Sequence, residues 1–213
     1  MLKMVCFDLD GTIADTIPMC IEVFRKAISP YAGHTLSDYE IIRTFGMNEK
    51  GMVKSIVGDM WQPALKDFYI CYERMLDMCT EPFQGIRELL EELTKRNVLI
   101  TMVTGKGLET CKITMNKLQL NHYFCEYITG SDKGNCKAEG MMYLLEKYNL
   151  RSDEFIYIGD AISDIIACEN ANVLCFSAAW AKSADLKALH AANSDLVFTN
   201  VSDLSKLIKD RIA

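Results

Sequence analysis

Three features are missing from this chain of 213 residues: an excess of basic residues, long uncharged apolar runs and paired cysteines. Lysine and arginine number 23 against 29 acidic residues, and the formal net charge of -6 gives no basic surface for nucleic acid. Asp8 and Asp10 interrupt the first apolar stretch, and no long uncharged run follows it. We therefore expect neither a signal peptide nor a membrane span.

The cysteines do not form a recognisable framework. There are nine of them, an odd number, and none belongs to a C-x-x-C pair. A disulfide scaffold or a zinc site is therefore not expected. Reduced, buried thiols account for the pattern better and predict a cytoplasmic protein.

Short apolar runs typical of strands recur along the chain and alternate with helical patterns. The candidate strands cover residues 4–10, 97–105, 126–131, 154–160, 173–178 and, more weakly, 195–199. Between them lie apolar residues at helical spacing, such as Leu89, Leu90 and Leu93. This alternation implies right-handed crossovers, so the predicted fold class is α/β, a doubly wound parallel sheet with helices on both faces.

One connection is too long for a simple crossover. Roughly ninety residues separate the first two candidate strands, where a helix and two short loops would suffice. Two stretches of this segment, 17–28 and 65–79, carry apolar residues at helical spacing. We therefore predict an α-helical subdomain at residues 16–82, inserted into a core of residues 1–15 and 83–213. It leaves the core at the carboxyl end of the first strand, the edge at which open α/β sheets bind ligands.

Polar residues end three of the candidate strands at that edge. The first strand runs into "DLDGT", the second into "TGKG" and the fourth into "GDAISD". The groups expected there belong to Asp8, Asp10, Thr104, Gly105, Asp160 and Asp164, with Lys137 opening the helical segment before the fourth strand.

Each feature alone has an ordinary explanation. Asp10-Gly11-Thr12 is typical of a plain turn, Thr104 of a helix cap and Lys137 of a solvated surface residue. Together they provide carboxylate oxygens, which suit Mg²⁺, and a lysine and a hydroxyl, which suit phosphoryl oxygens. A P-loop is excluded, because Ile100 and Gly107 stand where its pattern needs glycine and serine or threonine.

These motifs resemble those of the haloacid dehalogenase superfamily of phosphohydrolases. In this resemblance "DLDGT" is the first motif, Thr104 the second, Lys137 the third and "GDAISD" the fourth. The helical insertion between the first two motifs is similar to the cap of the phosphoglycolate phosphatase-like branch. The third motif departs from that branch, where Lys-Pro is common, because this chain has "CKAEG".

The resemblance implies a Mg²⁺-dependent phosphatase that hydrolyses a small phosphomonoester, similar to phosphoglycolate or a sugar phosphate. Asp8 is the implied nucleophile that becomes an aspartyl phosphate, and Asp10 is the implied general acid and base. The implied metal ligands are a carboxylate oxygen of Asp8, the backbone carbonyl of Asp10, and Asp160, with Asp164 bound directly or through another group. The implied phosphate-binding groups are Thr104, Gly105 and Lys137. In "RTFGMNEKGM", the implied substrate contacts of the cap are Phe45, Gly46 and Asn48.

Several alternatives stay open at this point. A phosphosugar mutase uses the same core and differs in its cap. A phospho-receiver also combines clustered carboxylates with Thr and Lys on a doubly wound sheet, but it is smaller and has no large helical insertion. A partner-binding pseudoenzyme would keep the motifs without turnover. The expected ligand is a small phosphorylated metabolite, with no nucleic acid or membrane partner, and the chain is expected to be a monomer or a homodimer.

Overall fold

The computed structural model describes residues 1–212 and has a six-stranded sheet at its centre. The strands are β1 (Met4–Phe7), β2 (Leu99–Val103), β3 (Glu126–Ile128), β4 (Phe155–Gly159), β5 (Leu174–Ala178) and β6 (Val197–Phe198). Their spatial order is β3-β2-β1-β4-β5-β6, and every neighbouring pair is parallel. The predicted doubly wound α/β class is confirmed, and each strand lies inside its expected segment.

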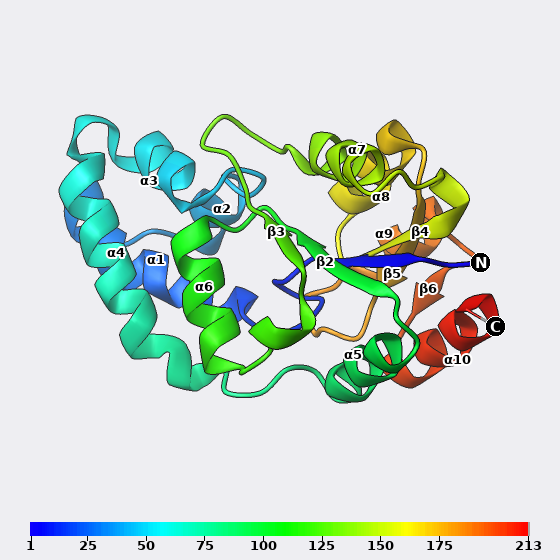
Figure 1. Ribbon diagram of the computed structural model, residues 1–213. Coiled ribbons are helices and arrows are strands. Elements are labelled where there is room, and N and C mark those ends of the chain that lie inside the picture. The colour runs from blue at the N-terminus through cyan, green and yellow to red at the C-terminus, as the bar shows by residue number, and fades with distance from the viewer. Residues whose placement is uncertain (213) are drawn as a thin grey trace.

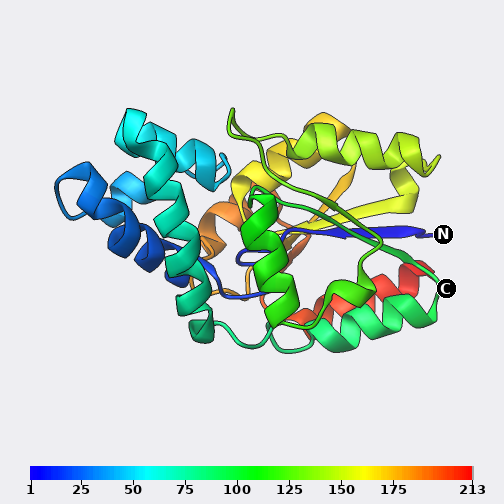
Figure 2. The same cartoon turned by 60° about the vertical axis from the view of Figure 1, so that its left-hand side comes forward.

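Helices cover both faces of the sheet (Figures 1 and 2). One face packs against α5 (Ile86–Lys95), α6 (Leu108–Lys117) and α10 (Val201–Ile212). The other packs against α7 (Lys137–Lys147), α8 (Ile162–Ala171) and α9 (Leu186–Ala192). Alternate residues of β1 enter the two apolar clusters, which is why this strand reads as an uninterrupted apolar run.

Four helices lie between β1 and α5, on the left of Figure 1. They are α1 (Ile17–Ala32), α2 (Asp38–Ile42), α3 (Glu49–Val57) and α4 (Trp61–Met75), with short 3₁₀ turns at Gly58–Met60 and Leu76–Met78. Two further 3₁₀ turns, Asn121–Tyr123 and Ser152–Glu154, precede β3 and β4. The four helices have an apolar cluster of their own, in which the rings of Phe24 and Phe68 lie 4.6 Å apart. The helical insertion is therefore present, while its limits at residues 16 and 82 stay a prediction.

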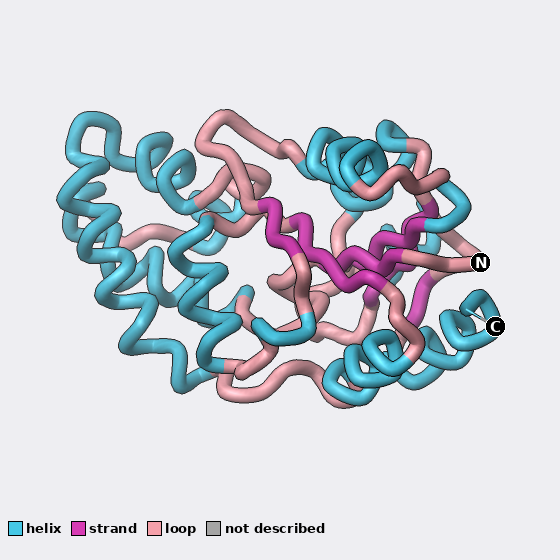
Figure 3. Tube along the Cα trace, in the orientation of Figure 1, coloured by secondary structure: helices cyan, strands magenta, loops and turns pink. Residues whose placement is uncertain are grey.

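The carboxyl ends of the strands point toward this helical unit. Figure 3 shows the loops that leave the central strands on the side of α1–α4. The loops after β1, β2 and β4 carry the polar residues that the sequence placed at one edge. The site is therefore built between the sheet edge and the four helices.

The cysteines and the helix lengths agree with a chain packed around apolar clusters. All nine cysteine thiols are free. The buried ones are Cys6, Cys79, Cys111, Cys168 and Cys175. No helix within residues 1–212 has both the length and the apolar character needed to cross a bilayer.

Two neighbouring positions of α5 test the packing on the sheet. Leu90 is fully buried in the larger cluster, so Leu90→Ala is expected to lower the free energy of unfolding by about 2–5 kcal/mol. Glu91 is exposed, and Glu91→Ala is expected to change it by less than about 0.5 kcal/mol. Urea unfolding followed by circular dichroism measures both. Equal losses in the two variants would contradict this packing.

Candidate active site

Asp8 is fixed at the end of β1 by its backbone and by both carboxylate oxygens. Its N–H donates to the carbonyl oxygen of Ile158 on β4 at 2.8 Å, which continues the strand pairing. Its Oδ1 accepts from the N–H of Leu9 at 2.7 Å, and its Oδ2 accepts from Nζ of Lys137 at 2.8 Å. With an exposed fraction of 6%, the Asp8 carboxylate is a nearly buried anion held in one orientation.

The turn after Asp8 brings β1 against the end of β4. Gly11 has a φ of +79°, which favours glycine, and a Cβ at this position would collide with the Asp160 carboxylate. A side chain at position 11 would therefore force the two loops apart. Carboxylate oxygens of Asp8, Asp160 and Asp164 lie within 4.8 Å of one another as a result.

Asp164 and Lys137 are buried next to Asp8, and the Lys137 ammonium bonds both carboxylates. Asp164 is fully buried and accepts from the N–H of Ala161 at 3.0 Å and from the Tyr157 hydroxyl at 3.2 Å. Its Oδ1 also accepts from Nζ of Lys137, at 2.5 Å. Burial alone would lower the pKa of Lys137, but the carboxylates of Asp164 and Asp8 raise it above its ordinary value. Lys137 is thus a permanently charged ammonium between two carboxylates.

Asp160 is the carboxylate of this group without a lysine. Asp8, Asp10 and Asp164 each form an ion pair with a lysine, whereas none reaches Asp160 within residues 1–212. Burial raises the pKa of the Asp160 carboxyl well above its ordinary value, and the charges of Asp8 and Asp164 raise it further. A divalent cation between Asp8 and Asp160 would relieve this repulsion, and an all-oxygen donor set is the one that Mg²⁺ takes. The residues present therefore fit a magnesium ion.

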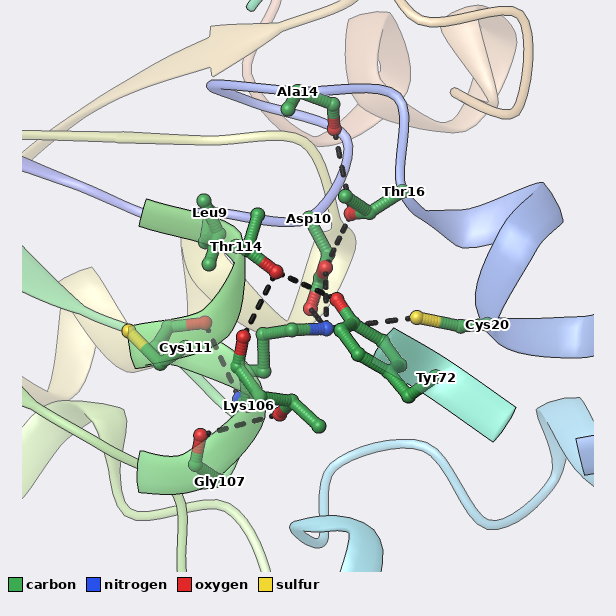
Figure 4. A network of polar contacts seen from close by, with 12 residues as sticks. Leu9, Asp10, Ala14, Thr16, Cys20, Tyr72, Lys106, Gly107, Cys111 and Thr114 are labelled. Atoms are coloured by element: carbon green, nitrogen blue, oxygen red, sulfur yellow. Dashed lines mark hydrogen bonds and ion pairs between the residues drawn. The ribbon is translucent and has the colours of Figure 1, made fainter. Parts of the chain in front are cut away.

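Asp10 belongs to a second network, on the side of the helical unit (Figure 4). Nζ of Lys106 lies 3.0 and 3.3 Å from the two oxygens of Asp10, and the Thr16 hydroxyl also donates to this carboxylate. The Lys106 side chain is only 2% exposed; it lies 4.8 Å above the Tyr72 ring, with Sγ of Cys20 at 3.5 Å. Burial acts to lower the pKa of Lys106, but Asp10 and, to a smaller extent, Cys20, Tyr72 and Glu49 together outweigh it and raise the pKa well above its ordinary value.

Glu49 and Tyr72 attach the helical unit to α6. Glu49, the first residue of α3, is buried and accepts from the N–H of Gly107 at 2.8 Å and from the Thr110 hydroxyl. The Tyr72 hydroxyl on α4 shares a hydrogen bond of 2.6 Å with that of Thr114. Because Glu49 meets the amide before the first residue of α6, its charge is also favoured by that helix terminus.

Asn48 makes a third contact between the helical unit and the core. Its Oδ1 accepts from the N–H of Gly51 and caps α3, while its Nδ2 donates to the carbonyl oxygen of Gly130 at 2.9 Å. Its own N–H donates to the carbonyl oxygen of Ser131 at 2.9 Å. Nearby, Nζ of Lys54 lies 3.1 Å from Asp132. The loop after β3 is thus bonded to α3.

One cavity of about 180 Å³ collects most of the residues singled out in the sequence. Those lining it are Asp8, Asp10, Phe45, Gly46, Thr104, Gly105, Lys137 and Asp160. Asp164 lies behind Lys137, and Asn48 faces the loop after β3 instead of the cavity. Two charged residues that line it, Lys106 and Glu49, were missed. Lys106 carried a signal, a lysine directly after Thr104-Gly105, whereas Glu49 depends on how α3 lies against α6.

The sequence comparisons decide the family. A sequence model of the haloacid dehalogenase-like hydrolase family matches residues 5–178. The chain belongs to this family. The resemblance stated from the motifs is thereby confirmed, and the protein is a hydrolase of the haloacid dehalogenase-like type.

Relatives of the hydrolase match over nearly its whole length. Pyrophosphatase PpaX of Bacillus mycoides is 23% identical over 213 residues, covering 97% of each protein. Phosphoglycolate phosphatase of Vibrio parahaemolyticus is 20% identical over 220 residues, covering 97% of this chain and 96% of that protein. The crystal structure of a hydrolase from Pseudomonas syringae superposes with a TM-score of 0.80 at 24% identity, covering 98% of each chain. This likeness extends to the helices between β1 and α5.

The pairing of Asp10 with Lys106 can be tested by unfolding. Asp10→Ala would leave a buried ammonium without its carboxylate and is expected to lower the free energy of unfolding by about 2–4 kcal/mol. Replacing both residues, Asp10→Ala with Lys106→Met, is expected to restore at least about 1 kcal/mol, because no buried charge then remains unpaired. Urea unfolding of both single variants and the double variant measures the coupling. Additive losses would show that the pair is not coupled.

Proposed function

We propose that this hydrolase is a Mg²⁺-dependent phosphatase acting on small phosphomonoesters through an aspartyl phosphate. The observation that carries the proposal is the arrangement around Asp8: one cavity places its carboxylate between the Lys137 ammonium and Asp160, with Asp10 in the wall. An oriented nucleophile, a cation for phosphoryl oxygens and a separate proton-transfer group are what hydrolysis through a covalent intermediate needs. The names of the relatives, phosphatase and pyrophosphatase, support phosphate chemistry.

In the first step, a carboxylate oxygen of Asp8 attacks phosphorus and the bond to the leaving oxygen breaks. Asp10, whose carboxylate takes up a proton when the ester binds, gives that proton to this oxygen, so the alcohol leaves neutral. In the second step, a water molecule attacks the phosphorus of the aspartyl phosphate and gives a proton to Asp10. Inorganic phosphate leaves, and both carboxyl groups return to their starting states. The contacts of Asp10 with Lys106 and Thr16 hold its carboxyl group in place for both transfers.

The phosphoryl oxygens would be bound by groups from two neighbouring loops. Thr104 and Gly105 line the cavity after β2, and the buried Thr104 hydroxyl accepts from the N–H of Lys106 at 3.2 Å. Lys137 reaches the same cavity from the start of α7. A hydroxyl, a backbone amide and an ammonium aimed at the transferring group stabilise the charge on its oxygens.

Asp8 and Asp160 would hold the magnesium ion, together with the backbone carbonyl of Asp10. Bound there, the ion would neutralise charge on the phosphoryl oxygens and so favour attack by a carboxylate. We assign Asp164 a different task, because its oxygens already accept from Lys137, Tyr157 and Ala161. It positions Lys137 and contributes to the ion only through that residue.

The four helices would act as a cap over this site. We propose residues 16–82 as the cap, attached to the core through Glu49, Asn48 and Tyr72. Phe45 and Gly46 line the cavity and are the proposed substrate contacts, whereas Asn48 is proposed to hold the cap. A cytoplasmic location and a monomeric or dimeric state stay predictions from the sequence.

Removal of the metal is the first test. Phosphate release from phenyl phosphate is expected to fall at least about a hundredfold in excess chelator and to return with added Mg²⁺. Asp160→Asn is expected to need a higher Mg²⁺ concentration for half-maximal rate, because one charged ligand is lost. The assay measures free phosphate. It therefore separates a phosphatase from a phosphosugar mutase, which moves the phosphoryl group between positions of a sugar and releases none. Full activity in excess chelator would refute the metal assignment.

Two substitutions separate the roles of the aspartates. Asp8→Asn is expected to abolish turnover of every ester, because an amide cannot form the acyl phosphate. Asp10→Asn keeps the nucleophile, so an aryl phosphate, whose leaving group needs little protonation, is expected to release about one equivalent of phenol per site in a burst. A slow phase then follows, since the water lacks its base.

Rapid mixing with acid-quenched labelling of the protein measures this burst. An alkyl phosphate is the matched control and should show no burst, since its leaving group requires the proton of Asp10. Steady turnover of alkyl phosphates by Asp10→Asn, or label on a residue other than Asp8, is incompatible with these roles.

A further inference from the structure

The cavity has two chemically different ends. The reaction end carries Asp8, Thr104, Lys137 and Asp160 from the sheet edge. The other end is formed by the helical unit and is almost entirely apolar. Its apolar side chains are Ile17, Phe24, Phe45, Met47, Met52 and Phe68, and Cys20 and Glu49 also line this end. A phosphoryl group bound at Asp8 would therefore direct the rest of the substrate toward aliphatic and aromatic side chains.

No cation is free to bind a second anion in this cavity. Within residues 1–212, the basic residues lining it are Lys106 and Lys137, and neither arginine nor histidine reaches it. Nζ of Lys106 is paired with Asp10 at 3.0 Å, and Nζ of Lys137 is paired with Asp8 at 2.8 Å and with Asp164. Both ammonium groups belong to the proposed catalytic site, and their charges are already balanced by these carboxylates.

The one charged residue on the helical side has the wrong sign for an anionic leaving group. Glu49 lines the cavity, is 6% exposed and is kept in place by the amide of Gly107 and the hydroxyl of Thr110. Both contacts are neutral donors, so the negative charge is not cancelled by a side-chain cation. A carboxylate or second phosphate placed here would lose its water, meet no cation and face Glu49.

We infer that the site selects phosphomonoesters whose leaving group is uncharged and largely apolar, and that it discriminates against phosphoglycolate and pyrophosphate. The inference rests on the proposed phosphatase function and narrows its substrate class. The cavity of about 180 Å³ restricts the leaving group to a short chain or a single ring. The inferred substrates thus differ from phosphoglycolate and pyrophosphate, the substrates in the names of the relatives. The difference follows from the helical side of this cavity and not from the shared motifs.

Matched esters test the inference on the wild-type protein. 2-Phosphoglycolate, its neutral amide and propyl phosphate have leaving groups of similar size and differ in charge and polarity. We expect kcat/KM for propyl phosphate and for the amide to exceed that for phosphoglycolate by at least about tenfold, since like charges without a counterion disfavour binding. Pyrophosphate is expected to be as poor as phosphoglycolate. Phenyl phosphate serves as the reference ester.

A new cation beside the cavity should weaken the preference. Phe45 lines the cavity and is 41% exposed, so Phe45→Lys places an ammonium there with access to water. This variant is expected to raise the phosphoglycolate to propyl phosphate ratio of kcat/KM at least about fivefold. Phe45→Met is the matched uncharged variant. Tyr39→Lys adds the same charge at a position that is 75% exposed and outside the cavity lining, and it should leave the ratio unchanged.

The outcomes separate the two proposals. If wild-type protein releases phosphate from no ester, phenyl phosphate included, the phosphatase function itself fails. Suppose that phenyl phosphate is hydrolysed, and that kcat/KM for phosphoglycolate or pyrophosphate equals that for propyl phosphate. The phosphatase function then stands, and the substrate inference is overturned. The inference also fails if Phe45→Lys and Tyr39→Lys change the ratio equally, because the effect would then come from net charge.

Discussion

The buried ammonium of Lys137 makes the acidic edge of the sheet possible. It lies between the carboxylates of Asp8, at 2.8 Å, and Asp164, both of which are buried. Burial raises the pKa of the Asp8 carboxyl, and the charge of Lys137 opposes this shift. The positions of Asp8, the loop at Gly11 and the start of α8 all depend on that compensation. Asp160 is the one carboxylate of the group that it leaves uncompensated.

The topology explains how residues so distant in sequence meet. β1 is central, with β2 on one side and β4 on the other, and all three strands run in the same direction. Their carboxyl ends therefore share one edge, and any polar group that follows a strand arrives there. The fold contributes placement, whereas the helical unit between β1 and α5 contributes the apolar wall. The acidic sheet edge and the apolar wall thus come from different parts of the chain.

The sheet and its edge could be predicted because they follow simple rules. Short apolar runs indicated the strands, and their alternation with helices indicated that the strands pair in parallel. The polar residues after β1, β2 and β4 could then be assigned to one place. The task of Asp164 could not, because it depends on the Tyr157 hydroxyl and the Ala161 amide, which only the folded chain brings to it.

The helical unit resisted prediction for a physical reason. Its helices are visible as apolar periodicity, but periodicity does not say how they lie against the core. The sequence suggested Asn48 as a substrate contact of the cap and did not single out Glu49, and α3 begins at these residues. One of them proves to be a buried anion against α6, and the other bonds the loop after β3. Such contacts depend on docking, which leaves no local pattern.

The loop between β3 and α7 connects the helical unit to the Lys137 ammonium. At one end, the carbonyl oxygens of Gly130 and Ser131 accept hydrogen bonds from Asn48. At the other end, the loop leads directly into Lys137, the first residue of α7. Movement of α3 away from the sheet would break these hydrogen bonds and loosen the segment that leads into Lys137. The contacts that hold α3 against the core and the position of the Lys137 ammonium are therefore linked through a single loop.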